Sequence, residues 1–470
     1  MSSNECAGFK SEYQNRVNYY WPDVNDKCKG GTLTIRHLEN KTYPDYIIRR
    51  FKIHNNTTNT NRHVTIFNYT TWSYHGLADP LSLVVFHRHV IRATDNSAGR
   101  YTVVHCSAGV GRTGTYIALD ALYREGEKTG IINVPMYVRR MRKDRMNMIQ
   151  GDEQYKLLYL ALMEAFSGPS RCLTTEKFVG AYQEQTCYAN RGDVVQTSSQ
   201  SIEFEELLSM RKKYTQRCYT SGRAQISANY TQSVLSVEEY MCHLSTIEGH
   251  ITYYNAILLQ SYLETDSLIS AQYPLPDNTE DFLRLVNDFD ARVVVFLCPL
   301  EDIDSTQAWF PTANHSKLNG LFVIKNTSST QASNVRITNL NIQKQEFTKI
   351  NITVVECPTW KEGKGTTDKR VLLDVIKAVK TEKSDQEGRI IVLSSDGVTR
   401  CGPFCVVYNV LEQISVDREV DIFTTTRQLQ VRRPEFVSTL DEYQLCHDAV
   451  AEYLINDRVM ETVTCEQKNE

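Results

Sequence analysis

The sequence predicts two tandem copies of an α/β domain in which helices pack against a β-sheet. Two observations lead to this prediction: a set of residues recurs at a fixed separation along the chain, and short strands alternate with amphipathic helices. The composition agrees with it, since 41% of the 470 residues are hydrophobic and 23% are charged, as is usual for globular proteins. A chain of this length has room for about two to four domains.

The recurring residues lie 288 positions apart. Trp72 recurs as Trp360, a pair that chance alone could produce. A continuous motif recurs as well, because the same residue types stand at +288 for Val104, Ser107, Gly109, Val110, Arg112 and Gly114. This string of matches indicates a duplicated domain.

The same offset predicts that the two copies differ in length. It places Met1 opposite residue 289, so the 112 residues from 177 to 288 have no counterpart in the first copy. We therefore expect four parts: a first copy without its N-terminal part at 1–170, a linker at 171–176, a complete second copy at 177–456 and a tail at 457–470.

Strands and helices follow one another along both copies. Short runs of β-branched and aromatic residues predict strands at 101–105, 291–297 and 389–393. Apolar residues at helical spacing predict helices at 113–123, 134–145, 153–166, 202–215 and 281–289. Residues 5–9, opposite the strand at 293–297, do not resemble a strand. We therefore expect the first copy to expose part of its core or an unpaired sheet edge, and to be marginally stable or to need the second copy.

Composition and charge exclude several classes of protein. A net charge of −4 gives no reason to expect binding to nucleic acid. No run approaches the roughly 18 apolar residues of a membrane span, and residues 1–10 lack the apolar core of a secretory signal. The 13 cysteines are dispersed without a CxxC pair, which is typical of a reduced, cytoplasmic protein. No cluster has metal-ligand spacing, so we expect neither a metal nor a cofactor.

The segment 104–114 carries the most specific chemistry, with a cysteine, five residues and then an arginine between a strand and a helix. Inward-pointing N–H groups of a glycine-rich loop form an anion site, and the positive end of the following helix adds to it. Arg112 supplies a guanidinium that can bind phosphate through two hydrogen bonds. The same field lowers the pKa of the Cys106 thiol and favours the nucleophilic thiolate. A buried structural cysteine beside a surface arginine would not need the flanking His105 or the three glycines of the loop.

This segment, from His105 to Gly114, resembles the signature of the protein tyrosine phosphatases. The run YWP at 20–22 is similar to another element of that family, and QGDEQY at 150–155 is similar to its Q-loop, with Gly151 where threonine is usual. The tandem arrangement resembles the cytoplasmic part of a receptor-type tyrosine phosphatase. The resemblance implies a central mixed β-sheet flanked by helices in each of two copies.

The resemblance also implies roles for the site residues. Cys106 attacks phosphorus to form a phosphocysteine, Arg112 holds the phosphoryl oxygens, and Thr113 donates its hydroxyl to Cys106 and helps to release it. Gln150 positions the water that hydrolyses the intermediate, with Gln154 as a second candidate, unless both are simply a polar helix start. The expected substrate-binding residues are Cys106, Ser107, Ala108, Gly109, Val110, Gly111, Arg112 and Gln154.

The first copy departs from the family at the general acid. The family's mobile loop carries an aspartate, but the run WSYHG at 72–76 places Tyr74 in that position. A tyrosine with an ordinary pKa of about 10 is a poor acid at neutral pH, and general acid catalysis usually contributes about 10²–10⁴-fold. His75 is a better substitute than Asp79, although His75 often has no catalytic role in the family.

The second copy departs at three catalytic positions at once, which hold Ser394, Glu362 and Ser438. Asp396 adds a negative charge inside the anion site, which opposes phosphate binding. Cys401 and Cys405 lie on the following helix, where we expect core or redox-sensitive thiols. This copy resembles the inactive membrane-distal domain of receptor phosphatases, with a regulatory or partner-binding role.

Two functions remain open. One is a phosphatase that acts on phosphotyrosine-containing proteins through Cys106, impaired by Tyr74. The other is a pseudophosphatase that binds such proteins, or acts as a scaffold, without turnover. The chain could also be part of a larger receptor, and would be tethered to a membrane only in that case. The second copy is expected to bind regulatory partners or the first copy, and the basic helix at 134–145 is either a solvated face or an attractant for acidic phosphopeptides.

Overall fold

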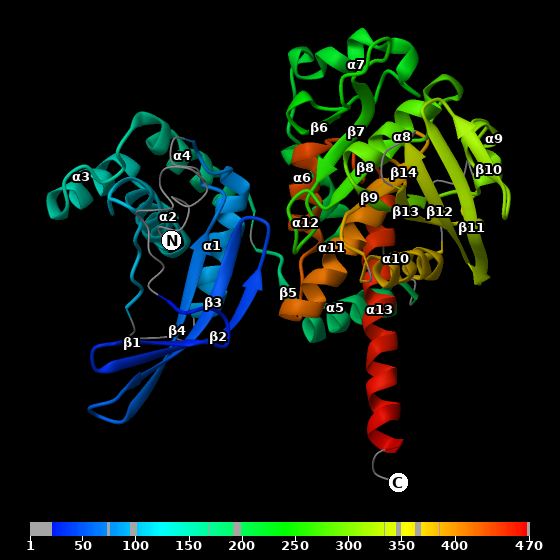
Figure 1. Ribbon diagram of the computed structural model, residues 1–470. Coiled ribbons are helices and arrows are strands. Elements are labelled where there is room, and N and C mark those ends of the chain that lie inside the picture. The colour runs from blue at the N-terminus through cyan, green and yellow to red at the C-terminus, as the bar shows by residue number, and fades with distance from the viewer. Residues whose placement is uncertain are drawn as a thin grey trace. The chain divides into compact units, whose positions relative to one another are not determined.

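The computed structural model describes residues 21–72, 76–94, 101–168, 170–190, 199–332, 334–344, 349–361, 368–384 and 386–467. The chain divides into two compact units, residues 1–170 and 171–470, which are treated separately below (Figure 1). Within the described ranges, no helix is long and apolar enough to cross a membrane.

Unit 1 combines a four-stranded antiparallel sheet with four helices in its described part. The strands follow in the order β1 (Lys27–Gly30), β2 (Leu33–Thr42), β3 (Tyr46–Asn55) and β4 (Thr60–Tyr69). The helices are α1 (Pro80–Thr94), α2 (Gly111–Thr129), α3 (Val134–Asp144) and α4 (Asp152–Phe166). Phe86 of α1 joins the two layers, since its ring packs against Tyr46 and Tyr69 of the sheet and Tyr116 of α2.

The strand expected at residues 101–105 of unit 1 is absent, so this prediction was wrong. Tyr101 is 100% exposed and Val103 81% exposed. The matching segment of unit 2 is a strand because parallel neighbours bond to it on both sides. In the described part of unit 1, no strand pairs with residues 101–105. A strand-like sequence forms a ladder only with a bonding neighbour.

Unit 2 is built on a mixed sheet of nine strands in the order β10-β11-β12-β13-β9-β14-β8-β7-β6. Strands β13, β9, β14 and β8 pair in parallel, and the remaining pairs are antiparallel. In chain order the strands are β6 (Met241–His243), β7 (Tyr253–Leu259), β8 (Leu268–Gln272), β9 (Ala291–Phe296), β10 (Ser316–Asn319), β11 (Phe322–Ala332), β12 (Val335–Lys344), β13 (Lys349–Glu356) and β14 (Arg389–Ser394). The mixed α/β architecture is therefore confirmed.

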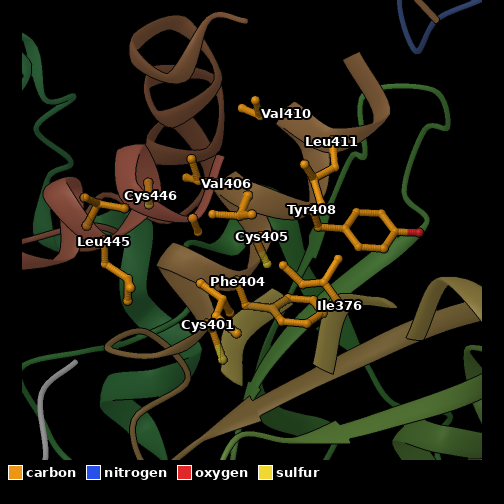
Figure 2. Packing of buried hydrophobic residues seen from close by; sticks show 14 of the residues in the cluster. Ile376, Cys401, Phe404, Cys405, Val406, Tyr408, Val410, Leu411, Leu445 and Cys446 are labelled. Atoms are coloured by element: carbon orange, nitrogen blue, oxygen red, sulfur yellow. The ribbon is translucent and has the colours of Figure 1, made fainter. Parts of the chain in front are cut away.

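Helices cover both faces of this sheet. They are α5 (Thr175–Asn190), α6 (Ser199–Met210), α7 (Thr220–Ala224), α8 (Thr279–Asp288), α9 (Thr306–Trp309), α10 (Lys369–Ser384), α11 (Cys401–Asp417), α12 (Ile422–Arg432) and α13 (Leu440–Gln467). Alternate residues of β9 point to opposite faces: Val293 and Val295 join one core cluster, and Val294 and Phe296 join the other. Figure 2 shows the first cluster, where Phe404 and Cys405 of α11 pack with Ile376 and Cys446.

The expected linker is part of unit 2 in the structure. Strand β5 (Leu173–Thr174) pairs with β15 (Glu419–Val420), and Arg171 forms an ion pair with Glu203 at 2.8 Å. The guanidinium of Arg171 also lies 4.4 Å from the centre of the Phe423 ring. Helix α13 continues to Gln467, so most of the segment expected as a tail is helical.

The remaining expected elements are present with small shifts at their ends. Helices α2, α3, α4 and α8 and strands β9 and β14 overlap the predicted ranges closely. Helix α6 ends at Met210, five residues before the predicted end at 215.

The start of α11 generates a stability prediction. A Cβ at Gly402 would lie 2.9 Å from the backbone nitrogen of Val437. We expect Gly402→Ala to lower the free energy of unfolding of unit 2 by about 1–3 kcal/mol, because backbone must move to admit the methyl group. Denaturant unfolding of the full chain measures this change.

Gly180→Ala is the matched control. Gly180 lies within α5, and an added Cβ would meet no atom within 4 Å. The control is expected to raise the free energy of unfolding by about 0.5–1 kcal/mol. Equal effects of the two substitutions would contradict the close approach of α11 to residue 437.

Candidate active site

The loop at residues 106–110 leads from the extended segment 101–105 into α2. Gly109 has φ +67°, a left-handed conformation that suits glycine, and it turns the backbone so that N–H groups face the sulfur of Cys106. Cys106 itself is half-buried at the bottom of this loop. The described residues therefore form a loop in which the N–H groups of Gly109 and Val110 face the sulfur of Cys106.

The electrostatics of the loop favour a thiolate at Cys106. Burial raises the pKa of the thiol, but hydrogen bonds from the hydroxyl and N–H of Thr113 oppose it. The N–H groups of Gly109 and Val110 add to this effect, and the net pKa lies below its ordinary value. The Thr113 hydroxyl has no other hydrogen-bond partner in the described part of the chain, so it is available to the sulfur.

Arg112 is buried in the first turn of α2 and connects this loop to the segment that precedes the predicted acid position. Its Nη1 donates to the carbonyl of Trp72 at 3.1 Å. In unit 2, Arg400 makes the equivalent bond to Trp360 at 2.8 Å. Tyr74, by contrast, lies outside the described residues, so the structure does not place its hydroxyl.

A third segment, residues 148–150, packs against the start of α2. The N–H of Ile149 donates to the carbonyl of Val110 at 3.2 Å, and Arg142 donates to the carbonyls of Met148 and Ile149 at 2.9 and 2.7 Å. Ile149 has φ +61°, which is costly for a β-branched residue. Val437, its counterpart at +288, has φ +50°, so both units hold the same strained geometry one residue before the Q-loop.

The two glutamines occupy different positions relative to the loop. The N–H of Gln150 donates to Oε1 of Gln154 at 3.0 Å, while the side chain of Gln150 is exposed. The amide of Gln154 lies so close to Gly111 that a Cβ there would be 2.9 Å from it. The structure therefore brings Gln154 against the loop more closely than the sequence suggested. Ser107 and Ala108 are exposed at the rim.

One residue of the site was not singled out from the sequence. Arg145 follows α3 and donates from Nη2 to the carbonyl of Ala108 at 3.1 Å. The sequence alone places it only among the charges of the basic helix at 134–145. The signal that could have identified it is its recurrence as Arg433 at +288.

The equivalent loop of unit 2 is filled by its own side chain. The N–H groups of Val398 and Thr399 donate to Oδ1 of Asp396 at 2.8 and 2.9 Å, and the Thr399 hydroxyl donates to Oδ2 at 2.6 Å. Ser394 also donates to Oδ1, at 3.2 Å. Burial raises the pKa of Asp396, but these hydrogen bonds lower it more, so the carboxylate is stabilised. The loop thus holds an internal anion where the family binds phosphate.

The other predicted site residues of unit 2 that the structure describes are buried or bonded within the unit. Oε2 of buried Glu442, the counterpart of Gln154, accepts from the N–H of Ser438 at 2.7 Å. Burial raises the pKa of Cys401 to about 12 and also raises that of Cys405, so both thiols stay protonated in the core shown in Figure 2. Glu362 lies outside the described residues.

The comparisons with known proteins agree with this fold. The family model for protein-tyrosine phosphatase matches residues 7–164 and 225–452. The chain therefore belongs to the protein-tyrosine phosphatase family and contains two tandem copies of its domain.

A receptor-type relative is also similar along nearly the whole chain. The chain is 28% identical over 459 residues to receptor-type tyrosine-protein phosphatase S of Gallus gallus. The match covers 95% of this chain and 30% of that protein, so the chain spans about a third of the length of its relative. Among the described residues, no group of three or more histidine, cysteine or acidic side chains is placed to hold a metal ion.

The filled loop of unit 2 gives a second prediction. Asp396→Ala should lower the free energy of unfolding by about 1–3 kcal/mol at neutral pH, because N–H groups lose a charged acceptor. Inorganic phosphate should recover part of this loss in the variant and leave the unsubstituted chain unchanged. Thermal melts with and without phosphate measure both effects.

The difference in stability between the unsubstituted chain and Asp396→Ala should depend on pH in one direction. The folded-state pKa of Asp396 is lowered, so its stabilisation is complete above the unfolded pKa of about 3.9 and is lost as pH falls through the folded pKa. The difference in stability between the two proteins should therefore be constant near neutrality and shrink below about pH 4. A constant difference down to pH 2 would show that the carboxylate is not the stabilising group.

A third prediction concerns the thiolate of unit 1. Alkylation of Cys106 by iodoacetamide should rise at a lower pH than for an ordinary thiol of pKa about 8.5, because its pKa is lowered. Thr113→Val removes the hydroxyl donor and should move this profile to higher pH. Mass spectrometry of the peptide that contains Cys106 follows the reaction, and the buried Cys405 is an internal control that should stay unmodified in the folded chain. An unchanged profile in Thr113→Val would exclude the hydroxyl as a cause.

Proposed function

We propose that this chain is a protein tyrosine phosphatase that removes phosphate from phosphotyrosine in proteins. The observation that carries the proposal is the Cys106 thiol, whose pKa is lowered by the hydrogen bonds of Thr113 and of the loop. Buried Arg112 stands beside this loop and supplies the guanidinium for the phosphoryl oxygens.

The proposed reaction has two steps. In the first, the Cys106 thiolate forms a bond to phosphorus while the bond from phosphorus to the tyrosine oxygen breaks, and the leaving oxygen takes up a proton. In the second, water attacks phosphorus and the bond to sulfur breaks, which regenerates the thiolate and releases phosphate. Gln150 and Gln154 are the candidates for positioning that water, and the Thr113 hydroxyl stabilises the departing thiolate.

The first step needs a proton donor for the leaving oxygen, and the sequence lacks the usual aspartate for this role. Tyr74 holds the position of the acid, and a group with an ordinary pKa of about 10 donates poorly at neutral pH. Efficient cleavage of an unactivated ester is therefore impaired, whereas phosphate binding and attack on an activated ester do not depend on this proton.

The second candidate function is phosphotyrosine binding without turnover. It is favoured by Tyr74 and by residues 101–105, which form no strand and are exposed at 101–103, just before Cys106. In either case unit 2, with Asp396 in its own loop, is assigned regulation or partner binding, with other proteins or with unit 1. The substrates or ligands are phosphotyrosine-containing proteins of the cytoplasm, and the chain reaches a membrane only as part of a longer receptor.

The fourth prediction separates the two functions by leaving group. The full chain should hydrolyse an aryl phosphate with an acidic phenol and hydrolyse phosphotyrosine slowly or not at all, because only the second needs a proton donor. Tyr74→Asp should raise the phosphotyrosine rate by about 10²–10⁴-fold and change the activated ester much less. Cys106→Ser is the control and should abolish both reactions.

The outcomes discriminate clearly. Equal rates for both esters would show that the acid is supplied from elsewhere. Rates that are unchanged in Cys106→Ser would exclude the enzyme proposal, and phosphotyrosine binding without turnover would then support the pseudophosphatase.

A further inference from the structure

The two units use equivalent arginines next to their loops in different ways. Arg145 donates from Nη2 to the carbonyl of Ala108 at 3.1 Å, and Arg433 donates from Nη2 to the carbonyl of Asp396 at 3.2 Å. Both pairs are related by the same 288-residue offset, so one interaction recurs in both copies. Each arginine also ends its helix in the same way, with its N–H donating to the carbonyl four residues earlier.

The rest of the Arg433 guanidinium is enclosed within unit 2. Its residue is 0% exposed, and both Nη atoms donate to Oδ1 of Asn255 at 3.1 Å. Asn255 lies on β7 of unit 2. Arg433 is therefore a structural residue that ties the loop to the sheet.

Arg145 keeps the bond to its loop, but within the described residues no side chain encloses it as Asn255 encloses Arg433. It is exposed, and the bond to Ala108 is the one hydrogen bond of its guanidinium within the described residues. No acidic side chain forms an ion pair with it in those residues. Its Nη2 would lie 3.2 Å from a Cβ at Gly109, so the guanidinium stands directly against the loop that surrounds Cys106.

We propose that Arg145 forms an accessory subsite that binds the carboxylate of an aspartate or glutamate neighbouring phosphotyrosine. The subsite deepens the function proposed above and rests on it, because the phosphotyrosine must occupy the Cys106 loop for the neighbouring side chain to reach Arg145. A planar guanidinium with free donors binds a carboxylate through two parallel hydrogen bonds. Unit 2 has no such subsite, since its arginine is enclosed.

The fifth prediction is a preference for acidic phosphopeptides that depends on Arg145. Fluorescence anisotropy is measured with the full chain carrying Cys106→Ser, so that peptides bind without turnover. The probes are matched phosphotyrosine peptides with glutamate or glutamine directly before or directly after the phosphotyrosine. The glutamate peptide should bind about two- to five-fold more tightly, as expected for an exposed ion pair, and this ratio should fall as salt is raised.

Arg145→Gln should bring the ratio close to one, and Arg145→Lys should retain part of it. Arg140→Gln is the matched control, since Arg140 is an exposed arginine of α3 without a hydrogen bond to the loop in the described structure. The ratio between two peptides is insensitive to a general loss of folded protein, which a thermal melt of each variant also monitors.

The possible failures are distinguishable. Binding of both peptides with an unchanged ratio in Arg145→Gln overturns the subsite and leaves the proposed function in place. An equal loss of the preference in Arg140→Gln also overturns the subsite and leaves the proposed function in place, because the preference would then come from the electrostatic field of the whole helix. If neither phosphopeptide binds, the proposed function fails and the subsite fails with it.

Discussion

The fold of both units depends on a loop whose inward-facing N–H groups require an anion. A buried donor without a partner costs about 1–3 kcal/mol, so several such donors in one loop cannot be left empty at little cost. Unit 1 supplies the sulfur of Cys106 as the acceptor, and unit 2 supplies the carboxylate of Asp396. This difference has a chemical consequence. The sulfur of Cys106 is a nucleophile, and the loop around it can also bind an incoming phosphoryl group. In unit 2 the carboxylate of Asp396 already accepts the hydrogen bonds that a phosphoryl group would need.

The loop is held in place from two directions, and the units differ in one of them. On the helix side, both units have a glycine, Gly114 or Gly402, that allows the helix to approach the following segment closely. In that segment both units have a β-branched residue at positive φ, Ile149 or Val437. On the sheet side, unit 2 anchors the loop through β14 between two parallel neighbours. Residues 101–105 of unit 1 do not form a strand, and Tyr101 to Val103 are exposed. In the described part of unit 1, the contacts that position the loop around Cys106 include those of α2 and of Arg145 after α3.

Local sequence signals predicted the parts of the fold that local forces determine. Helices such as α2 and α4 could be predicted because their apolar periodicity and the contacts it serves lie within the same segment. The strand at 101–105 was predicted from residue types, but a strand is a property of pairing, and its neighbours are not among the described residues. The pairing of β5 with β15 joins segments far apart in sequence, which made residues 171–176 look like a linker.

The candidate site shows the same division. The anion loop was predicted from the spacing of Cys106 and Arg112 together with His105 and the glycines around them, because the spacing by itself would also suit a structural cysteine. The sequence also predicted that Asp396 would oppose phosphate, but not that its carboxylate would satisfy the donors of the loop. The sequence does not distinguish Arg145 from the other basic residues in and after α3, because the position of a charge does not predict which backbone carbonyl the side chain contacts.

Binding and turnover place different demands on unit 1, and the retained parts serve them unequally. Binding needs the donor loop, Arg112 and, under our proposal, Arg145, all of which lie on or next to helices that the structure describes fully. Turnover needs in addition a proton donor at the position of Tyr74 and a loop that stays ordered while phosphorus changes partners. In unit 2, Asn255 of β7 encloses Arg433, and β8 pairs in parallel with β14. In unit 1, Arg145 is exposed, so under our proposals the described residues retain the groups needed to capture phosphotyrosine, whereas Tyr74 stands where turnover needs an acid.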